Sequence, residues 1–431
     1  MVTRTPASLT LTHDQQLALE QLHQFLDSPE RLFVLEGYAG TGKTTLLQAF
    51  VSELYERGDR RAIVFSAFTN KATKILTQMV ENWGIKVDCL TCCQLLGLKP
   101  QIDPDTGVQE FVPDKDQENS FGKFALVVVD ECSMINRNLW QLLMTEAMAF
   151  HLTSQILFVG DAAQLPPINE TASPTFLEIA NKAVLTEVVR YGSSIGVLAE
   201  SIRRDLNAPR LPAWRTQLNA DRTEGTIVLG KADWLKQLLR AFQSDKSQSD
   251  PDYVRALAYT NKRVIALNRQ IRDAIFGPEV GRFMPGERLI AMNPVFRREE
   301  EILIQTSAEC WVEAAKEKEW SGWRVWQLSV ETDTTTAEVL VLHETEQQRF
   351  QRELARLAAG KQWQDFWQLK QQRFANLNYS YALTIHKAQG STFENVFVDL
   401  PDVQRNRNIR ERNQLLYVAV TRAAQRLFLC R

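Results

Sequence analysis

The sequence lacks long hydrophobic runs, an excess of charge of either sign and a dense set of cysteines. No run approaches the roughly 18 apolar residues of a membrane-spanning helix, so we expect no membrane span. With 50 Lys and Arg against 52 Asp and Glu, the formal net charge is −2. Any groove for nucleic acid must therefore be local and offset by acidic residues elsewhere. A hydrophobic content of 44% with 24% charged residues excludes a wholly disordered or collagenous chain.

The six cysteines are too few and too scattered for a disulfide scaffold. The polar N-terminus has no apolar core of a secretory signal, so we expect a cytoplasmic protein with reduced thiols. Cys89, Cys92 and Cys93 do form a CxxC pattern. A zinc site would need more ligands at similar spacing, and a thioredoxin-like redox pair is the other alternative. We interpret these residues as free, buried or half-buried thiols.

The first half of the chain alternates short apolar runs with helical patterns. The runs predict buried strands at 32–35, 62–65, 125–129 and 156–159, with helices at 43–56 and 71–83. The alternation recurs near the C-terminus, with strands at 256–259, 395–398 and 426–430 and helices at 263–276 and 413–420. Strands of this type, alternating with helices, indicate parallel sheets covered on both faces. The fold class is therefore α/β, with two such domains in tandem.

Two stretches interrupt the alternation. Residues 98–119 carry a strong turn, Pro104-Asp105-Thr106-Gly107, between two short extended runs, which predicts a β-hairpin insertion. Residues 286–375 hold six of the ten tryptophans, strand-like runs and a charged helical stretch. We interpret this segment as a small β-barrel with a helical projection. Its tryptophans are expected in the barrel core, with base stacking as the alternative.

The segment from Gly37 to Thr44 fits the GxxxxGK[ST] pattern of a phosphate-binding loop between a strand and a helix. Its glycines let the backbone wrap phosphates, Lys43 adds a charge at the γ-phosphate, and the Thr44 hydroxyl is a ligand for Mg²⁺. Asp130 and Glu131 follow the strand at 125–129. We expect Asp130 to reach the Mg²⁺ shell and Glu131 to deprotonate the attacking water.

From spacing alone, Arg190 and Arg422 are either ordinary ion-paired side chains or arginine fingers. A set of motifs, found in a fixed order along the chain, favours arginine fingers. It comprises Gln15, the phosphate loop, Asp130-Glu131, residues 160–167 (GDAAQLPP), residues 384–391 (TIHKAQGS) and residues 417–423 (YVAVTRA). In this order the motifs resemble those of superfamily 1 helicases, and the QLPP and HKAQG sequences resemble the RecD/Dda branch.

The resemblance implies two RecA-like P-loop domains with ATP between them, a β-hairpin pin and an SH3-like β-barrel. It places the first RecA-like domain (1A) at 1–97 and 120–212 and the second (2A) at 213–285 and 376–431. The pin (1B) is then the insertion at 98–119, and the barrel (2B) with its helical projection is the insertion at 286–375. These boundaries are expectations from the resemblance.

The resemblance also assigns residues. Those implied in catalysis are Lys43, Asp130, Glu131, Gln164, Arg190 and Arg422. Gln15 would read the adenine, Gln164 would sense the γ-phosphate, and the remaining ATP contacts are Gly40, Thr41, Gly42, Thr44, Thr45 and Gly390. Thr44 and Asp130 would hold Mg²⁺. The DNA groove would be lined by Phe68, Thr69, Asn70, Lys71, Thr91, Thr260, Asn261 and His386, mostly at phosphates.

Two positions depart from the family pattern. Cys93 stands where the family usually has histidine, and a neutral thiol cannot replace a cationic donor. Phe68 stands where proline is usual. It either stacks a base or packs beneath the sheet.

The sequence therefore predicts an ATP- and Mg²⁺-dependent helicase that moves 5′→3′ on single-stranded DNA and unwinds tailed or forked duplexes. We expect a monomeric motor without membrane contact, acting in replication, repair or recombination, with single-strand-binding or replication proteins as partners. One alternative is a translocase that strips proteins from single strands. Others are a P-loop kinase or small-molecule ATPase, and a nucleotide-controlled scaffold without turnover.

Overall fold

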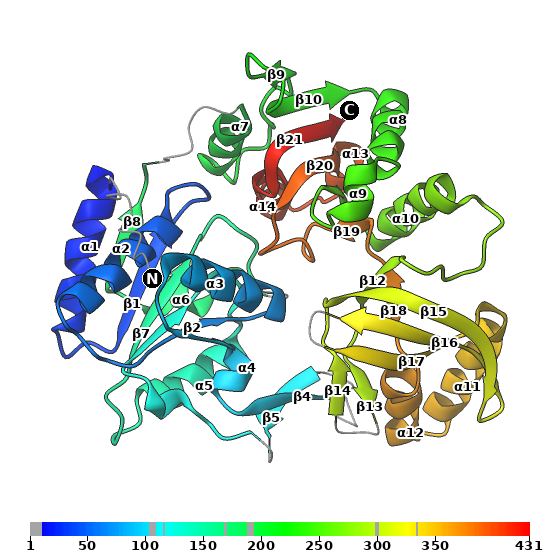
Figure 1. Cartoon of the computed structure of the whole chain (residues 1–431), viewed down its shortest axis with the longest axis horizontal. Coiled ribbons are helices and arrows are strands. Elements are labelled where there is room, and N and C mark those ends of the chain that lie inside the picture. The colour runs from blue at the N-terminus through cyan, green and yellow to red at the C-terminus, as the bar shows by residue number, and fades with distance from the viewer. Residues whose placement is uncertain are drawn as a thin grey trace, which may run out of the picture. The chain divides into compact units, whose positions relative to one another are not determined.

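The computed structural model describes residues 11–102, 109–114, 117–167, 170–187, 194–297, 301–332 and 335–431. The chain divides into two compact units (Figure 1). The first unit comprises Met1–Lys99, Phe111–Gly230 and Ala388–Arg431, and the second comprises Pro100–Glu110 and Lys231–Lys387. Among the described residues, every helix is too short or too polar to cross a membrane. The domain boundaries expected above stay predictions.

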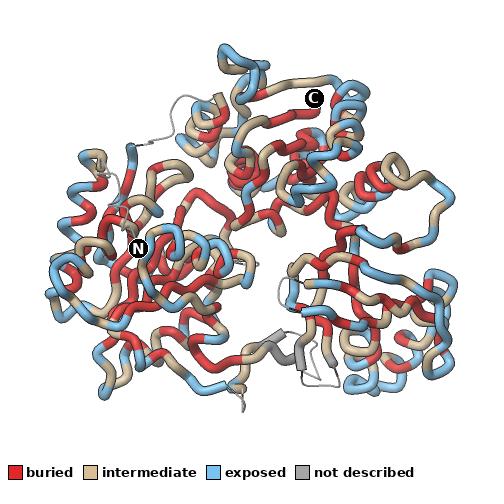
Figure 2. Tube along the Cα trace, viewed as in Figure 1, coloured by how far each residue is buried: buried red, intermediate tan, exposed pale blue. Residues whose placement is uncertain are grey.

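A six-stranded parallel sheet forms the centre of the first unit, in the order β3-β2-β6-β7-β1-β8. Strands β2, β6 and β7 are buried along their whole length, which explains their largely apolar sequences (Figure 2). The strands are β1 (Leu32–Gly37), β2 (Ile63–Ala67), β3 (Asp88–Thr91), β6 (Leu126–Val129), β7 (Gln155–Gly160) and β8 (Lys182–Leu185).

Helices cover both faces of this sheet. Neighbouring strand residues face opposite cores, since Val128 packs in the cluster with α1, α2 and α3, while Val127 and Val129 pack in the cluster with α4 and α5. The helices are α1 (His13–Leu26), α2 (Lys43–Glu56), α3 (Asn70–Trp83), α4 (Cys92–Leu95), α5 (Arg137–Ala147) and α6 (Pro174–Glu178). Short 3₁₀ turns occupy Phe121–Lys123 and Cys132–Met134. The predicted helix at 43–56 is confirmed residue for residue.

The first unit also contains a second group of strands and helices, which come from residues 194–230 and 393–430. Strands β20, β21 and β10 pair in parallel, and β9 pairs antiparallel with β10. The elements are α7 (Ser194–Arg203), β9 (Gln217–Leu218), β10 (Gly225–Leu229), β20 (Phe393–Asp399), α13 (Leu400–Val403), α14 (Ile409–Thr421) and β21 (Ala423–Cys430). Helix α14 begins four residues before the predicted start at 413 because Asn408 caps it, accepting a hydrogen bond from the Glu411 amide.

Strands β4 (Leu98–Ile102) and β5 (Gln109–Pro113) form a two-stranded sheet where the hairpin was expected. The predicted turn, Pro104 to Gly107, lies outside the described residues. The role of this hairpin as a pin therefore stays a prediction.

The second unit combines a small α/β part with an antiparallel sheet. Strands β11 (Val254–Ala258) and β19 (Ala382–Thr384) pair in parallel, and α10 (Asn261–Phe276) follows β11. Helices α8 (Lys231–Phe242) and α9 (Asp245–Ser249) precede them. This arrangement agrees with the strand and helix predicted near 256–276.

The antiparallel sheet of the second unit has the order β17-β16-β15-β12-β18. Its strands are β12 (Arg288–Ala291), β15 (Glu309–Trp320), β16 (Trp323–Thr332), β17 (Thr336–Leu342) and β18 (Leu377–Tyr379). Strands β13 (Val295–Arg297) and β14 (Glu301–Ile304) form a separate pair. The helical projection comprises a 3₁₀ turn (Glu344–Glu346), α11 (Gln347–Ala359), α12 (Trp363–Trp367) and a π-helical stretch (Gln368–Gln372). That this sheet is an SH3-like barrel stays a prediction.

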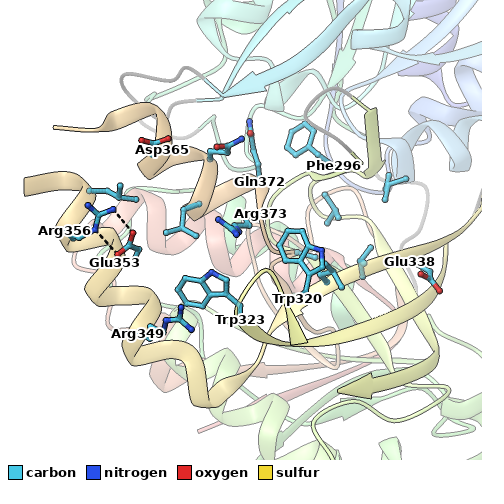
Figure 3. A pocket seen from close by; sticks show the side chains of 18 residues that line it. Phe296, Trp320, Trp323, Glu338, Arg349, Glu353, Arg356, Asp365, Gln372 and Arg373 are labelled. Carbon is cyan, nitrogen blue, oxygen red and sulfur yellow. Dashed lines mark hydrogen bonds and ion pairs between the residues drawn. The ribbon is translucent and has the colours of Figure 1, made fainter. Parts of the chain in front are cut away.

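The expectation that the tryptophans are core residues holds for two of them. Trp323 and Trp326 are only 6% and 9% exposed and belong to apolar clusters, whereas Trp363 on α12 is exposed. Trp320 and Trp323 also line a cavity of about 820 Å³ beside the helical projection (Figure 3). Arginines cover both rings, since Arg349 lies 4.3 Å from the Trp323 centroid and Arg373 5.4 Å from that of Trp320.

Buried ion pairs connect the two parts of the second unit. Arg272 of α10 donates to Glu287 at 2.6 Å, just before β12, and Glu287 is fully buried. Arg255 of β11, also fully buried, lies 3.2 Å from Glu309 of β15. Each buried charge has a charged partner, which offsets part of the cost of burying it.

We predict that Glu287→Gln will strongly destabilise the second unit, because it leaves the Arg272 guanidinium buried without its counter-charge. Removing one partner of a buried pair typically costs about 3–5 kcal/mol. Denaturant unfolding measures this change. Glu353→Gln is the matched control, since the Glu353–Arg356 pair lies at the surface, where such pairs contribute about 0–1 kcal/mol. Equal losses of stability in the two variants would contradict the prediction.

Candidate nucleotide-binding site

The phosphate loop connects the end of β1 at Gly37 to the start of α2 at Lys43. Gly40 and Gly42 have φ of 84° and 75°, in the left-handed region that favours glycine. The ammonium group of Lys43 donates to the carbonyls of Tyr38, at 3.1 Å, and Gly37. Thr44 is exposed in the first turn of α2. A helix N-terminus, an ammonium group and an exposed hydroxyl thus occur within this loop and the first turn of α2, which is the chemistry of a phosphate site.

Gln15 ties this loop to α1 with both ends of its amide. Its Nε2 donates to the Thr41 carbonyl at 2.9 Å, and its Oε1 accepts from the Thr12 amide at 2.9 Å as part of a capping box. The side chain is only 2% exposed. Gln15 therefore supports the loop directly, and its expected contact with adenine stays a prediction.

The predicted acidic pair lies at the end of β6. The Asp130 amide donates to the Ser66 carbonyl at 2.8 Å, and Glu131 adopts a left-handed backbone with φ of 51°. Burial and the neighbouring Glu131 raise the pKa of Asp130 to about 7, while the Lys43 ammonium opposes the rise. The Asp130 carboxylate, close enough to Lys43 for their charges to interact, is suited to Mg²⁺ bound with ATP, because Mg²⁺ prefers carboxylate and phosphate oxygens.

Gln164 is held by two glutamines from the C-terminal part of the first unit. Gln389 Nε2 lies 3.2 Å from Gln164 Oε1 and also 3.2 Å from Ser133 Oγ, while Gln414 Nε2 donates to the Gln164 carbonyl at 2.9 Å. Gln164 and Gln414 are 6% and 4% exposed. These hydrogen bonds connect Gln164 directly to α14 and to the segment around Gly390.

Three further residues contact the loop and were given no role above. The Tyr417 hydroxyl donates to Asp161 Oδ2 at 2.6 Å and accepts from the Ala39 amide at 2.9 Å. The Arg203 guanidinium lies 3.4 Å from the centroid of the Tyr38 ring. Asp161 and Tyr417 stand inside motifs that the sequence does reveal, but no sequence signal marks Arg203.

Of the two predicted arginine fingers, the structure describes only Arg422. Arg190 lies outside the described residues. Arg422 is 6% exposed and donates to the carbonyls of Ser391, at 3.0 Å, and Val418, at 3.3 Å. Its third bond is to Thr421 Oγ1 at 3.3 Å. These bonds all stay close to the end of α14, so a role for Arg422 at the γ-phosphate stays a prediction.

The predicted DNA contacts include three threonines that share one structural role. Thr69, Thr91 and Thr260 lie at or within two residues after the end of a strand and cap the next helix, accepting hydrogen bonds from the Ala72, Gln94 and Arg263 amides. Asn70 and Asn261 begin the helices that follow Thr69 and Thr260, and both are exposed. Each threonine oxygen accepts one amide in this way, so its hydroxyl proton and the other first-turn backbone amides are the donors that suit a phosphate.

The other predicted DNA contacts are more varied. Phe68 is half-buried and meets Phe111 of β5 edge-on at 6.4 Å, which favours the packing interpretation. Lys71 lies 5.2 Å from the Phe393 ring, and the exposed His386 lies 6.5 Å from the Tyr259 ring.

Burial raises the pKa of Cys93 to about 12, so it is a neutral thiol. All six cysteines are free. Within the described residues, no three His, Cys, Asp or Glu side chains gather as a metal site.

A phosphate loop between a strand and a helix of a parallel sheet, with an acidic pair at the end of another strand, defines a P-loop NTPase. Comparisons with known proteins narrow this class. The family model for an AAA domain matches residues 10–222, and the model for a UvrD-like helicase C-terminal domain matches residues 379–430.

Named relatives cover nearly the whole chain. It is 26% identical to the ATP-dependent DNA helicase dda of Enterobacteria phage T4, over 97% of this chain and 98% of that protein. It is also 26% identical to the ATP-dependent RecD2 DNA helicase of Deinococcus radiodurans, over 97% of this chain and 48% of that one. The fold resembles Bacteroides Pif1 helicase in complex with ADP-AlF3 and ssDNA, with a TM-score of 0.50, 15% identity and coverage of 97% and 92%.

By these matches the chain is similar to superfamily 1 helicases of the Dda/RecD type, and its fold is similar to that of a Pif1 helicase. Tandem RecA-like domains are the α/β architecture of this type, in agreement with the predicted fold class.

Proposed function

We propose that this protein is an ATP-hydrolysing DNA helicase that moves 5′→3′ along single-stranded DNA and unwinds duplex DNA. One observation carries the proposal. The phosphate loop, the acidic pair and the Gln164–Gln389 contact occur together in a chain that aligns along 97% of its length with an ATP-dependent DNA helicase. The direction of movement rests on the likeness to the Dda/RecD/Pif1 type.

The hydrolysis chemistry follows from the residues around the loop. Lys43 and the α2 N-terminus would neutralise the phosphates, and Thr44 and Asp130 would hold the Mg²⁺ that accompanies ATP. Glu131 would orient and deprotonate the attacking water. Arg190 and Arg422 would neutralise the charge that develops on the transferred phosphoryl group, after Arg422 leaves the Ser391 carbonyl.

Force generation would use the hydrogen bonds of Gln164. ATP binding near Gln164 would change its contacts with Gln389 and Gln414, and so the position of the C-terminal part of the first unit. Gln389 lies three residues after His386, a predicted DNA contact. Nucleotide state would in this way alter the grip on the strand.

The first test concerns hydrolysis. We expect Lys43→Ala to abolish DNA-stimulated ATPase activity because the phosphates lose their cation. Glu131→Gln should still bind ATP but lose turnover, because the water loses its base. A phosphate-release assay and nucleotide binding measure the two effects. Glu118→Gln, at a surface ion pair with Lys123, should behave like the parent, and normal turnover in Glu131→Gln would refute the assignment.

A second test concerns the strand-binding helix N-termini. Thr69→Asp should leave the melting temperature unchanged or higher, because aspartate is a good N-cap and its charge suits a helix N-terminus. The same negative charge should weaken single-stranded DNA binding about tenfold or more at low salt, since a nearby phosphate is repelled. Fluorescence anisotropy measures this affinity.

Two controls sharpen this test. Thr69→Ser keeps the cap without the charge and should bind normally. Ser244→Asp places the same charge at the N-cap of α9, a helix that holds none of the predicted DNA contacts, and should also bind normally. If Thr69→Asp binds as the parent does, Thr69 is no part of the groove.

The hairpin β4–β5 distinguishes a helicase from a motor that only strips bound proteins. Phe111 and Asp114 anchor the hairpin base, because Phe111 contacts Phe68 and the Asp114 amide donates to the Gly97 carbonyl at 2.8 Å. We propose that residues 101–110 act as the pin that separates the strands.

We predict that replacing residues 101–110 with two glycines will leave DNA-stimulated ATPase and 5′→3′ translocation intact but will abolish unwinding. A single-turnover assay on 5′- and 3′-tailed duplexes measures this. Only the 5′-tailed duplex should be unwound by the parent chain. Unwinding by the deletion variant at the parental rate would move the wedge to another segment, and loss of ATPase would show that residues 101–110 belong to the domain core.

The finer assignments belong to the same proposal. The six free thiols suit a reducing cytoplasm. We propose a monomeric motor that acts on single strands, tailed duplexes and forks during replication, repair or recombination, with single-strand-binding or replication proteins as partners.

A further inference from the structure

Residues far along the chain, on α7, on α14 and directly after β7, contact the phosphate loop. Asp161, which follows β7, accepts from the Ala39 amide at 3.1 Å, and Tyr417 of α14 accepts from the same amide at 2.9 Å. Arg203, the last residue of α7, covers the Tyr38 ring. All of these residues lie in the first unit.

We propose that Tyr417 and Arg203 are positioning residues that hold the phosphate loop in the shape that binds ATP. The proposal rests on the ATP-hydrolysing function proposed above and adds two residues to it. Neither side chain needs to touch ATP. Each acts through a loop residue, Tyr417 through the Ala39 amide and Arg203 through the Tyr38 ring.

Tyr417, Asp161 and the backbone amide of Ala39 are all hydrogen-bonded to one another. The Tyr417 hydroxyl donates to Asp161 Oδ2 at 2.6 Å, and the other oxygen of Asp161 accepts from the Ala163 amide at 2.9 Å. Tyr417 and Asp161 are 1% and 0% exposed. Burial and the Asp161 carboxylate raise the pKa of Tyr417 far above its usual value, so the hydroxyl keeps the proton that it donates. The Ala39 peptide is therefore fixed between two oxygens.

Arg203 restrains the neighbouring loop residue. Its guanidinium lies 3.4 Å from the Tyr38 centroid, a stacking distance for a cation on an aromatic face. The Tyr38 carbonyl in turn accepts from Lys43 at 3.1 Å and from Thr41 Oγ1 at 2.8 Å. Arg203 therefore restrains the residue whose carbonyl orients the phosphate-binding lysine.

Helix α14 makes this restraint responsive to the rest of the motor. Gln414 and Tyr417 are three residues apart, so they share one face of the helix. The side-chain Nε2 of Gln414 donates to the backbone carbonyl of Gln164 at 2.9 Å. The backbone amide of Gln164 donates in turn to the backbone carbonyl of Asp161 at 3.1 Å. The same helix face thus holds both the γ-phosphate sensor and the loop, so displacement of α14 would release both together.

The test separates ATP affinity from the chemical step. Tyr417→Phe keeps the ring and removes only the hydroxyl, and Arg203→Met keeps a long side chain without the charge. Each variant should raise the KM for ATP about 3- to 10-fold. The saturated kcat should stay within about twofold, because an interaction equal in ground and transition states changes only binding. DNA-stimulated ATPase assays measure both constants, and a labelled ADP gives the nucleotide Kd.

Matched controls come from the same unit. Tyr55→Phe removes a hydroxyl that donates to the Lys86 carbonyl, and Arg204→Met removes an exposed charge next to Arg203. Both should retain the parental KM. A parental KM in Tyr417→Phe and Arg203→Met would overturn the proposal, even if their melting temperatures fall. A drop in kcat of about 10³ in Arg203→Met would also overturn it, because it would make Arg203 a finger that touches phosphate. Absence of ATPase in the parent chain would instead refute the proposed function.

Discussion

Parallel strands of one sheet end at the same edge, and the nucleotide site of this protein depends on that constraint. Strands β6, β7 and β1 are neighbours in the order of the first sheet. The chain after β1 is the phosphate loop, the chain after β6 is Asp130-Glu131, and the chain after β7 is Asp161. Gly37 and Asp161, more than a hundred positions apart in the sequence, are thereby brought to one edge of the sheet. In open α/β sheets, ligands bind at this carboxyl edge of the strands.

The capping threonines stabilise helices, and the same helix N-termini have the chemistry that the predicted DNA contacts require. Thr69 and Thr260 each follow a buried strand and precede an exposed asparagine. Their hydroxyls satisfy one backbone amide of the following helix, while other first-turn amides stay directed outward. A phosphate is a suitable partner for such amides, and it carries no base information. A motor that must accept any sequence is well served by contacts of this kind.

The sequence is informative where chemistry requires fixed spacing. The phosphate loop, its helix at 43–56 and the acidic pair are predictable because few residues can satisfy that geometry. Contacts between distant segments are not predictable in this way. Arg422 is a good candidate finger in the sequence, yet its side chain donates to the Ser391 carbonyl. The side chain that covers the Tyr38 ring is Arg203, at the end of the amphipathic helix α7. This contact depends on how α7 packs in the folded chain, and no sequence motif marks it.

The second unit shows why buried charge need not indicate a catalytic site. Arg272, Glu287, Arg255 and Glu309 would attract attention as a cluster of buried charged groups, and burial does raise the pKa of Glu287. Each of these charges is paired with an opposite charge from a different element, and the pairs join α10 to the start of β12 and β11 to β15. Pairing of this kind keeps the α/β part and the antiparallel sheet in one fixed relation. The acidic pair at the nucleotide site differs, because Asp130 and Glu131 are adjacent like charges whose nearby cation, Lys43, also serves the phosphate loop.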